Sequence, residues 1–171
     1  MARAKTKPRA VLVIGVGNAC RGDDAVGLLV ARALRDRNRG QFRVLQCEGD
    51  ALALMELWEG ADEVILIDAI QAGGQPGAVY RFDTSAGEVA YDSLRPSTHS
   101  LSIGEAIELA RILKRLPPRL IIYGIEARDF TAGHELSSSV QQVLPDVVGR
   151  IWEETLASET ETADAHRSSE Q

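Results

Sequence analysis

Short apolar segments alternate with amphipathic ones along most of this chain, and the alternation constrains the fold more than any other feature of the sequence. The apolar runs Ala10–Gly15, Phe42–Cys47 and Glu63–Asp68 have the length of buried strands. Between the first two, residues 26–34 place apolar side chains three and four positions apart, as in a helix that packs on a sheet. This strand–helix–strand rhythm predicts a parallel sheet covered by helices.

The fourth strand is predicted to run antiparallel to the others. The step to this strand-like run, residues 78–82, contains three glycines and a proline and has only about nine residues, whereas a parallel crossover needs roughly a dozen or more. A helix over 102–113, a strand over Arg119–Ile125 and a last helix from about Ser137 to Leu156, kinked at Pro145, follow. The sequence therefore predicts an α/β fold, a three-layer sandwich with a mostly parallel, twisted five-stranded sheet and helices on both faces.

The two ends of the chain differ from its middle. Residues 1–9 are polar and basic, and residues 157–171 are acidic and show no apolar periodicity. We expect a flexible basic tail, a single α/β domain over residues 10–156 and a disordered acidic tail.

The charge balance excludes several kinds of partner. The chain has 25 acidic and 19 basic side chains, a net charge of -6, and no basic stripe of the kind that binds phosphate backbones. No apolar run approaches the roughly 18 residues of a membrane span, and no signal-peptide pattern is present. Cys20 and Cys47 lie outside any C-x-x-C spacing, so we expect two reduced thiols. We therefore expect a cytoplasmic protein that binds neither nucleic acid nor membranes.

The turn after the first strand, Gly15–Gly27, carries the first candidate site residues, Asp23 and Asp24. Its glycines are spaced G-x-G-x-x-x-x-G, which differs from the G-x-G-x-x-G of dinucleotide-binding turns, and two carboxylates at a helix start would repel a phosphate. A cation suits them better. The alternative is structural: Asp23 caps the helix and Asp24 complements its dipole, each contributing up to about 1 kcal/mol.

Two further candidates are expected at the same edge of the sheet. Asp68 ends the third apolar run at the carboxyl edge, where open α/β sheets carry their ligands, and a carboxylate there needs hydrogen bonds or a cation. His99 lies in the loop just before the helix at 102–113. A loop histidine is more often a solvated residue than a ligand, and His134 is a weaker candidate of the same kind.

Asp24, Asp68 and His99 could together bind a divalent ion such as Zn²⁺, Ni²⁺ or Mn²⁺. Three protein ligands leave open coordination positions. A metal with open positions can polarise a carbonyl, activate water or accept ligands from another molecule.

Four blocks of the sequence resemble, in their order and spacing, the signature of the NiFe-hydrogenase maturation endopeptidases. They are Gly15–Asn18, Asp23–Gly27, Ile67–Ala69 and Thr98–His99, and the resemblance covers roughly Val11–Val148. It implies a cytoplasmic hydrolase of peptide bonds, an endopeptidase that removes the C-terminal extension of a hydrogenase large-subunit precursor after nickel insertion.

By this resemblance, Asp24, Asp68 and His99 are the catalytic and metal-contacting residues. The resemblance also implies that they contact nickel already held by the precursor, so no permanently bound cofactor is expected, although Zn²⁺ or another divalent ion could occupy the site. Many members carry glutamate at the position of Asp24. The aspartate here is shorter by one methylene and keeps the same chemistry. Glu48 stands where many relatives have an aspartate, and we regard it as a candidate for substrate recognition.

The expected partner is the large-subunit precursor, and we expect the enzyme to be a monomer. One alternative is a non-catalytic α/β module that binds a metal or a partner protein during hydrogenase assembly, because the same three side chains would serve it. The sequence also leaves open whether the metal activates the attacking water or a carboxylate acts as the base.

Overall fold

The sheet has the predicted composition and direction. The computed structural model describes residues 11–48, 51–86 and 103–168, with side chains up to residue 158. Its five strands are β1 (Val11–Val16), β2 (Arg43–Cys47), β3 (Glu63–Ile70), β4 (Val79–Asp83) and β5 (Arg119–Glu126). They lie in the order β2-β1-β3-β5-β4, and all pairings are parallel except that of β4 with β5. The prediction of one antiparallel strand in a mostly parallel sheet is confirmed.

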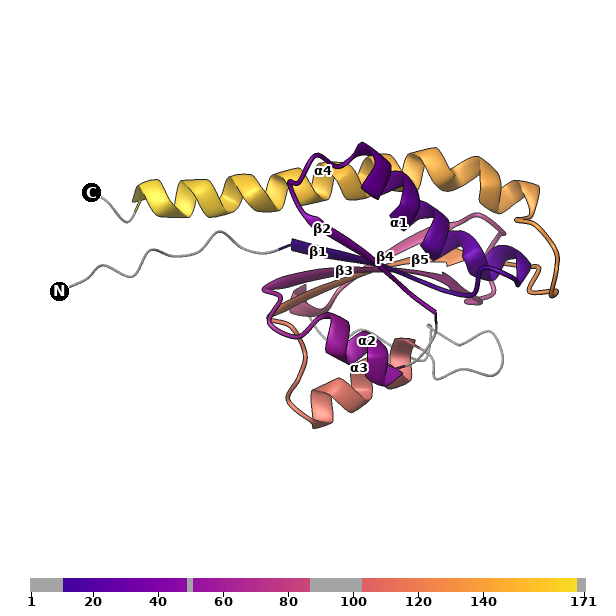
Figure 1. Ribbon diagram of the computed structural model, residues 1–171, viewed down its shortest axis with the longest axis horizontal. Helices are drawn as coiled ribbons and strands as arrows, with labels where there is room; N and C mark the ends of the chain where they lie inside the picture. The colour runs from indigo at the N-terminus through magenta and orange to yellow at the C-terminus, as the bar shows by residue number, and fades with distance from the viewer. Residues whose placement is uncertain (1–10, 49–50, 87–102, 169–171) are drawn as a thin grey trace.

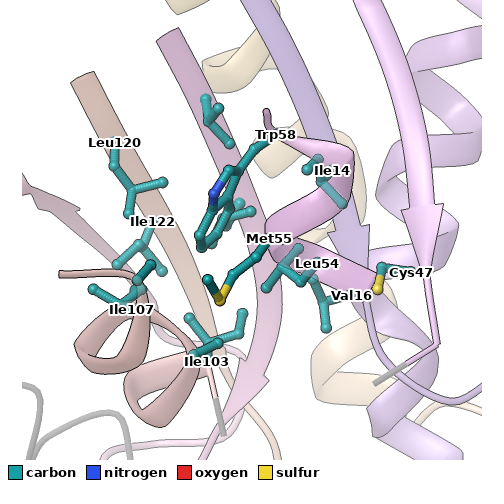
Figure 2. Close-up of a cluster of buried hydrophobic side chains, with 14 of the residues drawn as sticks. Ile14, Val16, Cys47, Leu54, Met55, Trp58, Ile103, Ile107, Leu120 and Ile122 are labelled. Carbon is teal, nitrogen blue, oxygen red and sulfur yellow. The ribbon is translucent and has the colours of Figure 1, made fainter. Parts of the chain in front are cut away.

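Helices cover both faces of this sheet, as predicted. Figure 1 shows α1 (Val26–Arg37) and α4 (Ser138–Ser168) on one face, and α2 (Ala51–Leu57) and α3 (Ile103–Ile112) on the other. Because side chains alternate along a strand, each face of the sheet has its own apolar cluster. Figure 2 shows Met55 and Trp58 packed with Ile107 between the sheet and the second pair of helices. The three-layer prediction is therefore confirmed.

The chain changes direction in the sheet between β1 and β3. From β1 the chain passes through α1 to β2, and from β2 it returns through α2, on the other face, to β3 beside β1. The connections that leave the carboxyl ends of β1 and β3 therefore diverge. Doubly wound sheets bind their ligands in the crevice that such a divergence opens.

The predicted end of the last helix at Leu156 is wrong, because α4 continues to Ser168. The helix surface that faces the sheet near its end is polar: Thr155 and Ser158 are buried, and the Ser158 hydroxyl donates to Glu63, 2.7 Å away. An apolar pattern cannot reveal such a contact. The expected disordered tail therefore loses residues 157–168 to the helix, while residues 1–9 lie outside the described part of the chain.

Other sequence expectations meet mixed outcomes. Cys20 is an exposed and Cys47 a buried free cysteine, as expected. Pro145 lies inside α4, and its predicted kink stays a prediction. Of the helices that the structure describes, none combines the length and the apolar character that crossing a membrane requires.

Candidate active site

Asp68 lies where β1 and β3 separate. The pairing of β1 with β3 ends at Gly15 and Ile67, whereas β5 follows β3 as far as Ile70. Asp68 is therefore the first residue of β3 beyond its contact with β1, and it is partly exposed although Ile67 and Ala69 are buried. The prediction that the third strand ends at Asp68 is wrong by two residues, since Ala69 and Ile70 still pair with β5. Its predicted place at the carboxyl edge is correct.

Asp24 lies in η1, a short 3-10 helix (Gly22–Ala25) between β1 and α1. Its backbone carbonyl accepts a hydrogen bond of 3.1 Å from the amide of Asn18. Gly17 lies against the same carbonyl, in a backbone conformation with φ of 150°, and an added Cβ would overlap the carbonyl oxygen. Gly27 lies so close to the carbonyl oxygens of Val16 and Ile67 that a Cβ there would overlap both. These glycines allow η1 and α1 to approach β1 and β3 closely.

The close approach brings the carboxylates of Asp24 and Asp68 into electrostatic contact. Burial raises the pKa of Asp68 well above its ordinary value, and the negative charge of Asp24 raises it further, while the amide of Ala69 acts in the opposite direction. Two carboxylates that disfavour each other's ionisation are stabilised by a cation held between them. The pair therefore has the electrostatics of a cation-binding site.

The structure says less about the other two predicted site residues, His99 and Glu48. His99 lies outside the described residues, and α3, on the face of the sheet toward which Asp68 points, begins at Ile103. Glu48 is exposed and follows Cys47, which pairs with Val16 at the end of β1, so it lies at the same edge as the acid pair. Within the described parts of the chain, no three His, Cys, Asp or Glu side chains form a metal site. The assignment of Asp24, Asp68 and His99 as a set of metal ligands stays a prediction.

Asp23 does not cap α1, so this part of the structural alternative is wrong, while the dipole role of Asp24 stays a prediction. No side chain caps either η1 or α1. The Asp23 carboxylate is fully buried and accepts hydrogen bonds from the loop between β5 and α4. The donors are the amides of Arg128 (2.9 Å), Asp129 (3.0 Å) and Ser137 (2.7 Å) and the hydroxyl of Ser137 (2.9 Å). Burial alone would raise the pKa of Asp23, but these hydrogen bonds lower it below its ordinary value.

Sequence reasoning missed these partners because they lie more than a hundred residues away. The same loop contains His134, whose Nδ1 is 2.8 Å from a carboxylate oxygen of Asp129. Hydrogen bonds from Thr131 and His134 hold the pKa of Asp129 well below its usual range. His134 thus has a carboxylate partner within its own loop. This agrees with the expectation that His134 is a weaker candidate for a ligand than His99.

The turn after β1 is unsuited to phosphate. Six of its amides donate to backbone carbonyls of the protein itself: those of Gly17, Asn18, Arg21, Gly22, Asp23 and Asp24. A dinucleotide-binding turn needs such amides to point at the pyrophosphate. The close contacts of Gly17 and Gly27 also show that these glycines serve packing between the helix and the strands.

The fold is an α/β fold that places two acids together at the carboxyl edge of its sheet, and comparison with known proteins identifies the family. A family model described as hydrogenase maturation protease matches residues 28–154, a range that includes Asp68 and begins shortly after Asp24. Protein FrxA from Pyrococcus furiosus is 30% identical over 129 residues, which cover 72% of this chain and 89% of FrxA.

Solved structures agree. The NiFe hydrogenase maturation protease HybD from Thermococcus kodakarensis is 26% identical, with a TM-score of 0.67 over 85% of this chain and 99% of that one. The hydrogenase maturating endopeptidase HybD from E. coli is 20% identical and has the same fold, with a TM-score of 0.70 over 87% and 93% of the two chains. This chain belongs to the hydrogenase maturation protease family. It is an endopeptidase, a hydrolase of peptide bonds, with a role in hydrogenase maturation.

Proposed function

We propose that this endopeptidase removes the C-terminal extension of a NiFe-hydrogenase large-subunit precursor after nickel insertion. In this proposal, Asp24, Asp68 and His99 contact nickel that the precursor carries. The observation that supports it is the proximity of Asp24 to Asp68 at the carboxyl edge of the sheet, where the negative charge of Asp24 disfavours the ionised form of Asp68. The enzyme itself then needs no permanent metal.

The acid pair explains how nickel in the substrate is recognised. A nickel-free precursor offers no metal ion to the two carboxylates. A precursor that carries nickel brings a cation that can take oxygens of Asp24 and Asp68 as ligands. Recognition is then a test of whether the metal has been inserted.

The same residues can carry the hydrolytic step. A water molecule attacks the carbonyl carbon of the scissile peptide bond, its proton passes to a base, and the amine leaves with a proton. Nickel can lower the pKa of that water. Alternatively, Asp68 can accept the proton, because a raised pKa makes a carboxylate a stronger base.

We further propose that the precursor contacts Glu48, which is exposed at the same edge of the sheet as the acid pair. The substrate approaches the carboxyl edge, where a protein-sized partner can reach both positions at once. We propose that the enzyme acts on this partner as a monomer in the cytoplasm.

Mass spectrometry of the precursor tests the proposal. Purified enzyme is incubated with nickel-loaded and with nickel-free large-subunit precursor, and we expect the C-terminal extension to be lost only from the first. A nickel-loaded precursor that keeps its full mass would contradict the proposed cleavage, and equal cleavage of both forms would contradict the role of nickel.

A pair of histidine variants tests the assignment of His99. His99→Ala should abolish processing, whereas His134→Ala, a matched change in another loop, should leave it intact because His134 already pairs with Asp129. Processing by His99→Ala at the wild-type rate would remove His99 from the site.

A further inference from the structure

Two loops that are far apart in the sequence are joined beside the acid pair. The backbone amide of Asp23 donates to the carbonyl of Asp129 over 2.7 Å, and that of Gly22 donates to the carbonyl of His134 over 3.1 Å. In return, the amide of Gly133 donates to the carbonyl of Cys20 over 2.8 Å. The Asp23 carboxylate lies within this junction and accepts the four hydrogen bonds described above. We call this carboxylate and its donors in Arg128, Asp129 and Ser137 the Asp23 clasp.

The clasp differs from an ordinary helix cap in what it connects. A capping carboxylate satisfies amides of its own helix, whereas the donors here come from the loop that leads from β5 to α4. A buried carboxylate that accepts several hydrogen bonds is held in one orientation, since any rotation would leave amides without an acceptor. The clasp therefore fixes the position of η1 against the β5–α4 loop.

Asp24 is the next residue along the same 3-10 turn. With about three residues per turn, successive side chains in such a helix point in directions well apart, so Asp23 can be buried in the clasp while the charge of Asp24 acts on Asp68. On its other side, Asp24 is held through its carbonyl by the amide of Asn18. Its backbone is thus fixed from both directions.

We propose that Asp23 is a positioning residue, which holds the Asp24 carboxylate opposite Asp68 by fastening η1 to the β5–α4 loop. The inference rests on the proposed function in so far as Asp24 and Asp68 contact the substrate's nickel. Whether the clasp fixes the backbone around Asp24 can be measured without any assay of nickel recognition.

The test compares Asp23→Asn with Glu63→Gln in the full-length chain. Glu63 is also a fully buried acid, accepting a hydrogen bond from Ser158 and contacting Arg119 at 3.3 Å, but it lies at the opposite end of β3. Both changes replace a buried carboxylate by an amide of similar shape. The two measurements are amide hydrogen exchange and the kinetics of processing of the nickel-loaded precursor.

In Asp23→Asn we expect exchange at the amides of Asn18 and Asp24 to become at least tenfold faster. We also expect kcat for processing to fall about tenfold and KM to rise, since a misplaced Asp24 contributes less both to binding the nickel and to the cleavage step. In Glu63→Gln, exchange at these two amides and kcat should stay at wild-type values. Ser137→Ala, which removes one hydrogen bond of the clasp, should show the same effects to a smaller degree and serves if Asp23→Asn does not fold.

Three results would overturn the proposal. They are unchanged exchange at Asn18 and Asp24 in Asp23→Asn, equally faster exchange in Glu63→Gln, and faster exchange in Asp23→Asn with a wild-type kcat. If the wild-type enzyme does not process the precursor, the proposed function fails, and the exchange comparison alone then decides whether the clasp holds Asp24.

Discussion

Strand β3 carries an acid near each of its ends, and the two acids have opposite surroundings. Glu63, at the amino end, is fully buried, lies 3.3 Å from the guanidinium of Arg119 and accepts a hydrogen bond from Ser158. Asp68, near the carboxyl end, is partly exposed, and its pKa is raised by burial and by the neighbouring charge of Asp24. One carboxylate has its cation within the protein, and the other meets a second carboxylate.

The basic partners at the amino edge form a network. Arg119 also lies 3.4 Å from Asp83 on β4, and Asp83 in turn lies 3.2 Å from Arg81. Arg81 pairs with Glu154 of α4. Acids at this edge thus connect strands and a helix, and their charges are balanced internally. The comparison teaches that two acids on one strand can differ in role: one is paired inside the protein, and the other lies beside a second acid and is the candidate for function.

The largest effect that distinguishes the two ends of β3 should be on processing. Asp68→Asn removes a charged ligand from the proposed site, and we expect the rate of precursor cleavage to fall by roughly 10²–10⁴-fold, equivalent to several kcal/mol of lost stabilisation. Cleavage is followed by mass spectrometry at a temperature where both proteins are folded. A loss of less than about threefold would remove Asp68 from the chemistry.

The second-largest effect should be on the stability of the protein, and it concerns Glu63 at the amino end of β3. Glu63→Gln leaves Arg119 without its full charge partner, and we expect the free energy of unfolding to fall by roughly 1–3 kcal/mol, measured by urea denaturation. Processing at 25 °C should stay at the wild-type rate. If Glu63→Gln instead lost processing with unchanged stability, the contrast between the two ends would be wrong.

A third, smaller effect concerns pH. Because the pKa of Asp68 is raised in the folded protein, its ionised form destabilises the fold, and this cost builds up as the pH rises from the ordinary pKa of an aspartate to the folded pKa. At high pH, the free energy of unfolding of Asp68→Asn should therefore exceed that of the wild type by roughly 0.5–2 kcal/mol, the usual range for single stabilising changes. The gain should shrink as the pH falls below the folded pKa and vanish below the ordinary pKa of an aspartate. Urea titrations at several pH values check this, and a pH-independent difference would contradict it.

The smallest effect isolates the interaction between the two site acids. Asp24→Asn removes the neighbouring negative charge, so the pKa of Asp68 should fall, while burial keeps it above the ordinary value. NMR titration of the Asp68 carboxyl carbon measures the change. Asp83→Asn, at the paired edge, is the control and should leave the pKa of Asp68 where it is.

Much of the fold could be predicted from the sequence because it depends on local patterns. Apolar runs and helical spacing fix the strands and helices, and the short step before Val79 fixes the direction of β4. The proximity of Asp24 to Asp68 followed from the same logic, since Asp24 follows β1 and Asp68 lies near the carboxyl end of the parallel strand β3. The family was indicated by the motifs and is confirmed by the comparisons.

The failures all involve partners distant in the sequence. Beyond Leu156, α4 contacts the sheet through the polar pair Ser158 and Glu63, and the role of Asp23 depends on amides of the β5–α4 loop. The last two residues of β3 pair with β5 alone, so no local pattern marks where the strand ends. Polar contacts of this kind have no periodicity from which they could be inferred.

The central claim is that the acid pair recognises nickel inside the substrate, and binding affinity tests it most directly. The dissociation constants of nickel-loaded and nickel-free precursor are measured for the wild-type enzyme and for the double variant Asp24→Asn, Asp68→Asn. We predict that the wild type binds the nickel-loaded precursor at least tenfold more tightly, about 1.4 kcal/mol, and that the double variant binds both forms equally. Equal binding by the wild type, or a preference that survives in the double variant, would contradict the account.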